Sequence, residues 1–347
     1  MRILFWHVHG SWATAFVQGA HDYVVPLTPD RCPDGRGRAR TYPWPDTVRE
    51  VPCERLAREE FDVVVLQRPH EIELAERWTG RRPGRDVPAV YVEHNTPAGD
   101  VPHTRHPLAG RGDIPLVHVT HFNALFWDSG LAPVHVIEHG VVDPGYRYTG
   151  ELARAGVVVN EPLRRRRVAG TDLLPGFAAA VPLDVFGMKV TSLPADLGTT
   201  GLPAGPGTTG LPAELGSAGL PAGPGTAGRV AVHEDLPQSA MHAELARRRV
   251  YLHPYRWTSL GLSLIEAMLL GLPVVALATT EAVEAVPPEA GVVSTRPATL
   301  VDALRAFADD PPRARQAGKA GRAAALARYS LERFLTDWDD LFRGLVP

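Results

Sequence analysis

Two successive series of short β-rich runs set the strongest limit on how this chain folds. The first series is RILFWHV, YVVPL, FDVVVLQ, VPAVYVEH, PLVHVTH and VHVIEHG. The second begins near residue 150 and is AGVVVNEP, PLDVFGM, GRVAVHE, RVYLHP, PVVALA and AGVVS. Several runs are apolar without clean alternation, which is typical of parallel strands buried on both faces. Because mostly helical segments separate the strands, the pattern predicts an α/β protein of two doubly wound domains.

The domain limits follow from the start of the second series of strands near residue 150. We expect an N-terminal domain over residues 1–150, a C-terminal domain over 151–329 and a closing helix over 330–347. A chain of 347 residues is long enough for two separate cores. In the closing segment, apolar residues recur at steps of three and four, which predicts an amphipathic helix. These residues are Leu331, Phe334, Leu335, Trp338, Leu341, Phe342 and Leu345.

Residues 192–227 do not fit the α/β pattern. They contain a nine-residue repeat in four copies, such as GLPAGPGTT, with Asp196 and Glu214 as the charged residues and no aromatic side chain. Glycine and proline recur too often for a helix, and the few leucines cannot build a core. We predict a flexible insertion between two strands of the second domain.

Composition excludes several classes of partner. Lys plus Arg total 36 and Asp plus Glu total 39, so the net charge of −3 gives no field for nucleic acid. Cys32 and Cys53 have no metal-binding spacing, which fits a reducing, cytoplasmic compartment. The start MRILFWHVHG is interpreted as a strand and not a signal peptide. Since no stretch of 18 apolar residues occurs, we expect no membrane span, while contact with a membrane surface stays open.

One acid stands inside an apolar helix. The segment RWTSLGLSLIEAMLLGLPVVA, residues 256–276, predicts a buried helix around Glu266, and a buried carboxylate without a partner is costly. The preceding strand and glycine loop make the helix N-terminus an anion site, where Gly261 admits a phosphate and Glu266 accepts from ribose hydroxyls. The alternative is a capping box, in which Glu266 reaches back to the N–H of Ser263.

This block carries a family resemblance. TSLGLSLIEAMLLGLPVVA resembles the donor-site block of glycosyltransferase family 4, whose members are retaining enzymes of GT-B fold. The resemblance covers most of residues 130–347 apart from the insertion. It implies two Rossmann-like domains facing a central cleft, with a nucleotide sugar bound by the C-terminal domain. The matching positions are Gly261, Leu262, Glu266, Ala267, Met268, Gly271, Pro273, Val274 and Val275.

The resemblance implies specific donor-site residues. It assigns donor binding to Thr258, Ser259, Gly261, Leu262, Glu266, Glu284 and Gly187. Two positions depart from the family pattern, because Thr258 replaces an acid that contacts the donor sugar and Ala169 replaces a lysine that contacts the diphosphate. The run Arg164 to Arg167 could supply the lost charge. We expect Arg164 and Arg167 to act in catalysis, and Arg165 and Arg166 to lie in solvent.

The N-terminal domain is expected to hold the acceptor. His9, Gly10, Ser11 and Trp12 follow the first strand, and the carboxyl ends of strands line the crevice in such folds. His94 follows another strand and resembles the histidine that family members place near the reacting sugar, so it is a catalytic candidate. The implied reaction moves a hexose from a nucleotide diphosphate sugar to an acceptor hydroxyl, with retention and without a metal or cofactor.

Two other functions remain open from the sequence. His7 and His9 form an H-x-H pair on one face of a strand, which also occurs in metal-dependent hydrolases of barrel fold. In that interpretation His94, His121 and His139 would supply further ligands. With Thr258 and Ala169 in place of charged residues, the chain could instead bind a sugar nucleotide or glycan without turnover.

Overall fold

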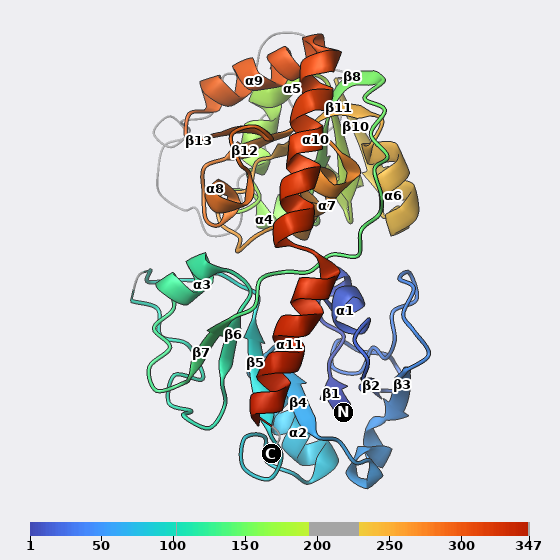
Figure 1. The fold of residues 1–347 in the computed structure, drawn as a ribbon, viewed down its shortest axis with the longest axis vertical. Coiled ribbons are helices and arrows are strands. Elements are labelled where there is room, and N and C mark those ends of the chain that lie inside the picture. Colours follow the sequence, from blue (N-terminus) through green and yellow to red (C-terminus); the bar gives the residue numbers. More distant parts are fainter. Residues whose placement is uncertain (102, 194–228, 346–347) are drawn as a thin grey trace. The chain divides into compact units, whose positions relative to one another are not determined.

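The computed structural model describes residues 1–101, 103–193 and 229–345, and the chain folds into two compact units (Figure 1). Unit 1 comprises Met1–Asp143 and Arg328–Pro347, and unit 2 comprises Pro144–Ala327. These limits lie close to the predicted boundaries. The predicted repeat insertion falls outside the described residues except for Ser192 and Leu193. No helix in the described part of the chain combines the length and apolarity needed to cross a membrane.

Unit 1 is built on a seven-stranded parallel sheet in the order β3-β2-β1-β4-β5-β6-β7. Its strands are β1 Arg2–Phe5, β2 Asp22–Leu27, β3 Val48–Pro52, β4 Val63–Leu66, β5 Ala89–Glu93, β6 Leu116–His118 and β7 Val134–Val136. Its helices are α1 Gly10–Phe16, α2 Glu71–Thr79, α3 His121–Phe126 and α11 Leu331–Leu345, with a 3-10 helix over Cys53–Arg58.

Unit 2 repeats this architecture with a six-stranded parallel sheet in the order β10-β9-β8-β11-β12-β13. Its strands are β8 Leu152–Val158, β9 Leu183–Gly187, β10 Val230–Glu234, β11 Arg248–His253, β12 Val274–Leu277 and β13 Gly291–Ser294. Its helices are α4 Pro162–Arg165, α5 Leu174–Ala180, α6 Gln238–Leu245, α7 Leu262–Leu270, α8 Ala282–Ala285, α9 Pro297–Asp309 and α10 Pro311–Arg328, with 3-10 helices over Thr171–Leu173 and Val190–Ser192.

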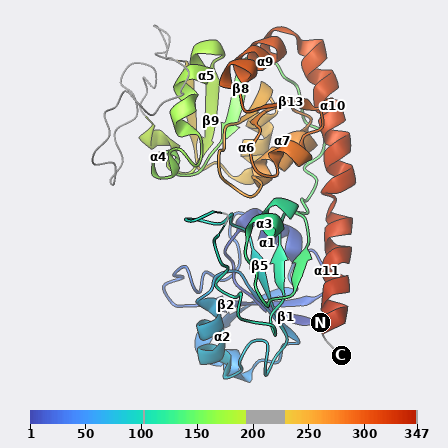
Figure 2. The same ribbon diagram turned by 90° about the vertical axis from the view of Figure 1, so that its left-hand side faces the viewer.

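Both sheets are covered on two faces, as predicted for doubly wound domains. In unit 2, α9 packs with α5 on one face, while α6 and α7 pack together on the other (Figure 2). In unit 1, successive side chains along β1 point to opposite faces of the sheet and therefore enter two different cores. Phe5 contacts Phe16 of α1 edge to face, whereas Leu4 and Trp6 lie in a cluster with Leu74 of α2. The prediction of an α/β protein with two doubly wound domains is confirmed.

The closing helix α11 belongs to unit 1. Its apolar stripe places Phe334, Trp338 and Phe342 in the core, where Trp338 packs against Trp12 and Phe16 of α1. The predicted helix and the observed one differ by one residue at the start. Aromatic pairs of this kind add about 0.5–1.5 kcal/mol each beyond the area that they bury.

One strand was missed from the sequence. The strand β3, VREVP, lies at the edge of the unit 1 sheet and pairs only with β2 among the described residues. Its Arg49 is exposed and Pro52 closes the strand. An edge strand tolerates charge and proline because one of its sides is unpaired, and this weakens the β signal.

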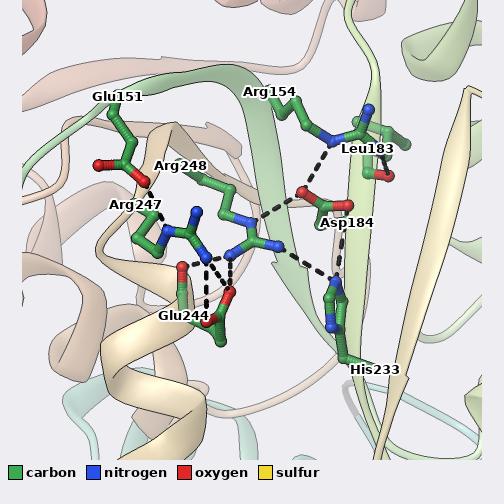
Figure 3. Close-up of polar contacts among 8 residues, drawn as sticks. All are labelled: Glu151, Arg154, Leu183, Asp184, His233, Glu244, Arg247 and Arg248. Carbon is green, nitrogen blue, oxygen red and sulfur yellow. Dashed lines mark hydrogen bonds and ion pairs between the residues drawn. The ribbon is translucent and has the colours of Figure 1, made fainter.

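An ion network centred on the buried side chains of Asp184 and Arg248 joins four strands of unit 2, β8, β9, β10 and β11 (Figure 3). The carboxylate of Asp184 on β9 accepts hydrogen bonds from Arg154 Nε at 2.8 Å and from Arg248 Nε at 2.7 Å. Arg248 also donates to Glu244 of α6 and contacts His233 of β10. Burial raises the pKa of Asp184, but the two arginine hydrogen bonds outweigh it, so the pKa lies below its usual value.

Sheet topology locates where each unit can bind a ligand. In unit 1 the chain passes from β1 to β2 and β3 on one side, and then crosses to β4 on the other side of β1. Unit 2 repeats this pattern, with β9 and β10 on one side of β8 and β11 on the other. In open α/β sheets, the loops that follow such neighbouring strands diverge at the carboxyl edge, and ligands bind in the crevice between them. In unit 1 the switch point lies between β1 and β4, and in unit 2 it lies between β8 and β11.

Candidate functional site

The arginine-rich loop of unit 2 lies at this switch point. It follows β8, and its backbone is tied to the loop that follows β11. The N–H of Arg256 donates to the carbonyl of Val168 at 2.9 Å. Gly170, with φ of +69°, comes so close to Pro254 that an added Cβ would lie 1.8 Å from the Pro254 oxygen. Only glycine fits such a contact, so the backbones of the two loops pack directly against each other. We refer to the two packed loops as one surface.

Helix α7 starts beside this surface. Its N-cap is Gly261, which has no side chain with which to cap the first turn. The capping-box alternative is therefore wrong: Ser263 lies inside the helix, and its hydroxyl oxygen lies 2.9 Å from that of Tyr251. Tyr251 is buried on β11, so its bond with Ser263 ties the first turn of α7 to the sheet. The free N–H groups of the first turn are then available to an anion.

A buried histidine lies against the N-cap. A Cβ on Gly261 would lie 2.7 Å from His253 Cε1, so glycine is needed here for space. Burial lowers the pKa of His253 to about 3, and the positive charge of Arg165 lowers it further. The imidazole is therefore neutral at physiological pH. His253 was not predicted as a site residue, because a histidine inside a buried strand is usually structural.

Arg165 is the arginine of the run that faces this surface. Its guanidinium lies over the ring of Tyr255, 5.2 Å from the centroid, and cation–π contact of this kind stabilises the position. No acid in the described part of the chain forms an ion pair with it. The expectation that Arg165 lies free in solvent was wrong, since a short helix, α4, turns its side chain toward Tyr255.

The two arginines predicted to act in catalysis already have acidic partners. Arg164 Nε donates to Glu161 at 2.8 Å, and Arg167 lies 3.4 Å from Asp172. Their side chains are 70% and 65% exposed. Hydrogen bonds from Arg164 and then Lys189 lower the pKa of Glu161 to about 2, so it is ionised. These pairs reduce the net positive charge that either arginine offers to a ligand.

Glu266 is held by the neighbouring helix α6. Its side chain is 5% exposed. Gln238 Nε2 donates to one carboxylate oxygen at 2.9 Å, and His242 Nε2 lies 3.4 Å from the other. The structure therefore gives the buried acid two polar neighbours from one helix. The remaining lone pairs of the carboxylate are not used by these contacts.

The remaining predicted donor residues lie along the same edge of unit 2. Thr258 and Leu262 are partly exposed, and Ser259 is buried. Gly187 ends β9 with φ of +140°, and an added Cβ would lie 2.2 Å from the Val159 oxygen, so the glycine is required by the backbone contact. Glu284 is exposed on the one-turn helix α8.

Three histidines gather at the carboxyl edge of unit 1. The rings of His9 and His94 lie 4.1 Å apart, and those of His94 and His139 lie 6.5 Å apart. Burial lowers the pKa of His9 to about 4 and of His139 to about 3, and it lowers that of His94 well below its usual value. All three are therefore neutral near pH 7. The sequence indicated His9 and His94 as acceptor-side or catalytic residues, and His139 only as a possible metal ligand; the fold places all three together.

Of the predicted acceptor-side residues, Trp12 is buried. It is 1% exposed, and its indole stacks on Phe16 and packs against Trp338. Trp12 also lies edge to face with His94, at 5.1 Å between the ring centroids, so it packs behind the candidate site and is not exposed in it. Gly10 and Ser11 are partly exposed in the first turn of α1.

The structure separates the two histidines of the H-x-H pair. Strand β1 ends at Phe5, so His7 and His9 do not share a strand face. His7 Nδ1 donates to the carbonyl of Gly37 at 3.2 Å, whereas His9 contacts His94. Two sheets replace the barrel that the hydrolase interpretation required, so that interpretation is wrong. The described residues contain no group of three His, Cys, Asp or Glu suited to a metal ion.

Two parallel-sheet units, each with polar side chains at its switch point, place the protein in the GT-B fold class. The comparisons with known proteins agree. A model of the family described as glycosyl transferase-like matches residues 208–340. No curated protein sequence matches the chain.

Solved structures share the fold at low sequence identity. The sucrose-phosphate synthase of Thermosynechococcus elongatus is 15% identical with a TM-score of 0.67, and the alignment covers 99% of each chain. HepE of Anabaena, in complex with UDP, is 14% identical with a TM-score of 0.62, covering 99% of this chain and 100% of HepE. AviGT4, a glycosyltransferase involved in avilamycin A biosynthesis, is 13% identical with a TM-score of 0.59, covering 100% of this chain and 98% of AviGT4.

Proposed function

We propose that the protein is a glycosyltransferase that moves a hexose from a nucleotide diphosphate sugar to an acceptor hydroxyl. One observation carries the proposal: at the switch point of unit 2, Arg165 has no acidic partner among the described residues, and its charge acts on His253, which lies against the N-cap Gly261 of α7. A cation and free backbone N–H groups together suit a diphosphate. The glycosyl transferase-like match and the UDP-bound HepE structure support it.

The donor would lie along the carboxyl edge of unit 2. Arg165 and the N–H groups after Gly261 would stabilise the negative charge that builds on the leaving diphosphate. Because the protein supplies this charge, the transfer would need no metal. Glu266 would accept from the ribose hydroxyls, and Thr258 would contact the sugar. Retention of the anomeric configuration rests on the family resemblance of the donor block.

The acceptor would lie on unit 1. His9, Ser11 and His94 present polar groups at its carboxyl edge, where the loops after β1 and β5 end. Because the imidazoles are neutral, they can accept a hydrogen bond from a hydroxyl. Both cysteines are free thiols, which supports a reducing, cytoplasmic location.

A thermal-shift panel of nucleoside diphosphates and their sugars tests the donor assignment. At 100 times its Kd, a ligand stabilises the folded state by about 2.7 kcal/mol. We expect at least one nucleoside diphosphate to raise the Tm in a saturable way, and Arg165→Ala to reduce that shift. If no nucleoside diphosphate raises the Tm of the wild type, the proposal fails.

A further inference from the structure

Gln67 lies next to His94 at the carboxyl edge of the unit 1 sheet. It follows β4 and is buried, with 2% of its surface exposed. Its backbone N–H donates to Glu71 Oε2 at 2.6 Å, which fixes the main chain. Its side chain therefore has little freedom, and the atoms that it presents to its neighbours are set by the surrounding hydrogen bonds.

Those hydrogen bonds decide the orientation of the Gln67 amide. The side-chain nitrogen lies 2.6 Å from the carbonyl oxygen of Trp6. A carbonyl can only accept, so the atom facing it must be the donating NH₂ group. The amide oxygen consequently points the other way, to His94, whose Nε2 lies 3.2 Å from it.

The position of the Gln67 amide oxygen also determines which nitrogen of His94 carries the proton. An amide oxygen can only accept, so His94 Nε2 must carry the hydrogen. A neutral imidazole has one N–H, and burial keeps His94 neutral. Its Nδ1 is therefore left with a lone pair that can accept a hydrogen bond.

We infer that Gln67 is a positioning residue that locks His94 in the Nε2–H tautomer, so that Nδ1 accepts a hydrogen bond from a substrate hydroxyl. This inference rests on the proposed function for the identity of the hydroxyl. The tautomer itself does not depend on that function. His9, whose ring lies 4.1 Å from that of His94, and His139 are the titratable neighbours packed against the same imidazole.

The test is a two-bond ¹H–¹⁵N spectrum of the full chain labelled with ¹⁵N-histidine. His94→Gln identifies the His94 signals by their loss. In the wild type we expect Nε2 to carry the proton and Nδ1 to be unprotonated at pH 7. The opposite tautomer, or an even mixture, would overturn the inference without reference to any activity.

Two variants of Gln67 and one control variant test whether Gln67 sets the tautomer of His94. Gln67→Leu removes the acceptor, so the His94 signals should shift toward the other tautomer. Gln67→Glu keeps an acceptor and adds negative charge, so the pKa of His94 should rise by about one unit or more. Gln18→Leu is the control, because Gln18 also donates to a backbone carbonyl in unit 1, that of Thr14 at 3.0 Å.

Gln18→Leu should leave the His94 signals unchanged. With turnover established, Gln67→Leu should lower kcat about tenfold or more while the Kd for nucleoside diphosphate stays the same. An unchanged tautomer in Gln67→Leu overturns the positioning role. Absence of turnover in the wild type would refute the proposed function, while the spectra would still decide the tautomer.

Discussion

The guanidinium of Arg165 lies 5.2 Å from the ring centroid of Tyr255, and its charge contributes to the low pKa of His253, which ends β11 and lies against the N-cap of α7. This relationship distinguishes Arg165 from Arg164 and Arg167 in the arginine run. Arg164 and Arg167 have carboxylate partners, whereas Arg165 has none in the described part of the chain. We therefore propose Arg165 as a ligand of the diphosphate.

Arg165→Ala should lower turnover about tenfold or more, which corresponds to about 1.4 kcal/mol of lost charge stabilisation. Arg164→Ala is the matched control, because it removes the same charge from the same loop but breaks a pair with Glu161. Steady-state kinetics of both variants with one donor measures the difference. Equal effects at the two positions would contradict the assignment.

Glu266→Gln should weaken binding of ribonucleoside diphosphates, because an amide replaces one accepting oxygen with a donor. A 2′-deoxynucleoside diphosphate serves as the control ligand, since it lacks one of the two hydroxyls. We expect the variant to lose affinity for the ribonucleotide and to lose less for the deoxy ligand, as measured by calorimetric titration. Equal losses for both ligands would show that Glu266 supports the fold and does not hold the ribose.

Gln238→Ala tests whether α6 holds the Glu266 carboxylate in place. The hydrogen bond from Gln238 Nε2 at 2.9 Å would be lost, and we expect the preference for ribose over 2′-deoxyribose to fall by several-fold. The same calorimetric titrations measure it. An unchanged preference, with the fold intact, would mean that Glu266 needs no support from Gln238.

Asp184→Asn should destabilise unit 2 by about 3–5 kcal/mol near pH 7, because it leaves Arg154 and Arg248 without their shared carboxylate. The folded-state pKa of Asp184 is depressed, so its contribution is present above the unfolded pKa of about 3.9 and is lost as pH falls through the folded value. The gap in unfolding free energy between wild type and variant should shrink in acid. Denaturant unfolding at several pH values measures it, and a constant gap would contradict the account.

Trp338→Ala should destabilise unit 1 by about 3–5 kcal/mol, because the indole is buried between α11 and α1. Leu341→Ala is the control on the same helix, since Leu341 is only partly buried. The thermal midpoints of the two variants provide the comparison. A similar small loss for both would show that α11 is not anchored through its aromatic stripe.

The fold could be predicted because its signals are local and repeated. All twelve β-rich runs contain strands, and the apolar period of residues 331–345 specifies α11. The strand β3 gave no such signal, since its edge position needs little apolar surface. The buried partners of Glu266 could not be predicted from the sequence either, because they depend on how α6 packs against α7.

The location of the candidate site in the fold could be predicted from the sequence, but the identity of some of its residues could not. Gly261, Glu266, His9 and His94 follow strand ends, and the sequence places such residues at one edge of a parallel sheet. Which arginine of a run turns inward depends on the local helix α4 and on the aromatic partner Tyr255. Neither is visible as a periodicity.

The most direct test of the account is turnover. Wild-type protein is incubated with a panel of nucleotide diphosphate sugars and acceptors, and both released nucleoside diphosphate and glycosylated product are measured by mass spectrometry. The account predicts equal amounts of the two for at least one donor, with release reduced about tenfold or more in Arg165→Ala. Clear nucleotide binding without release from any donor would contradict it and would identify a sugar-nucleotide binding protein that has lost catalysis at Thr258 and Ala169.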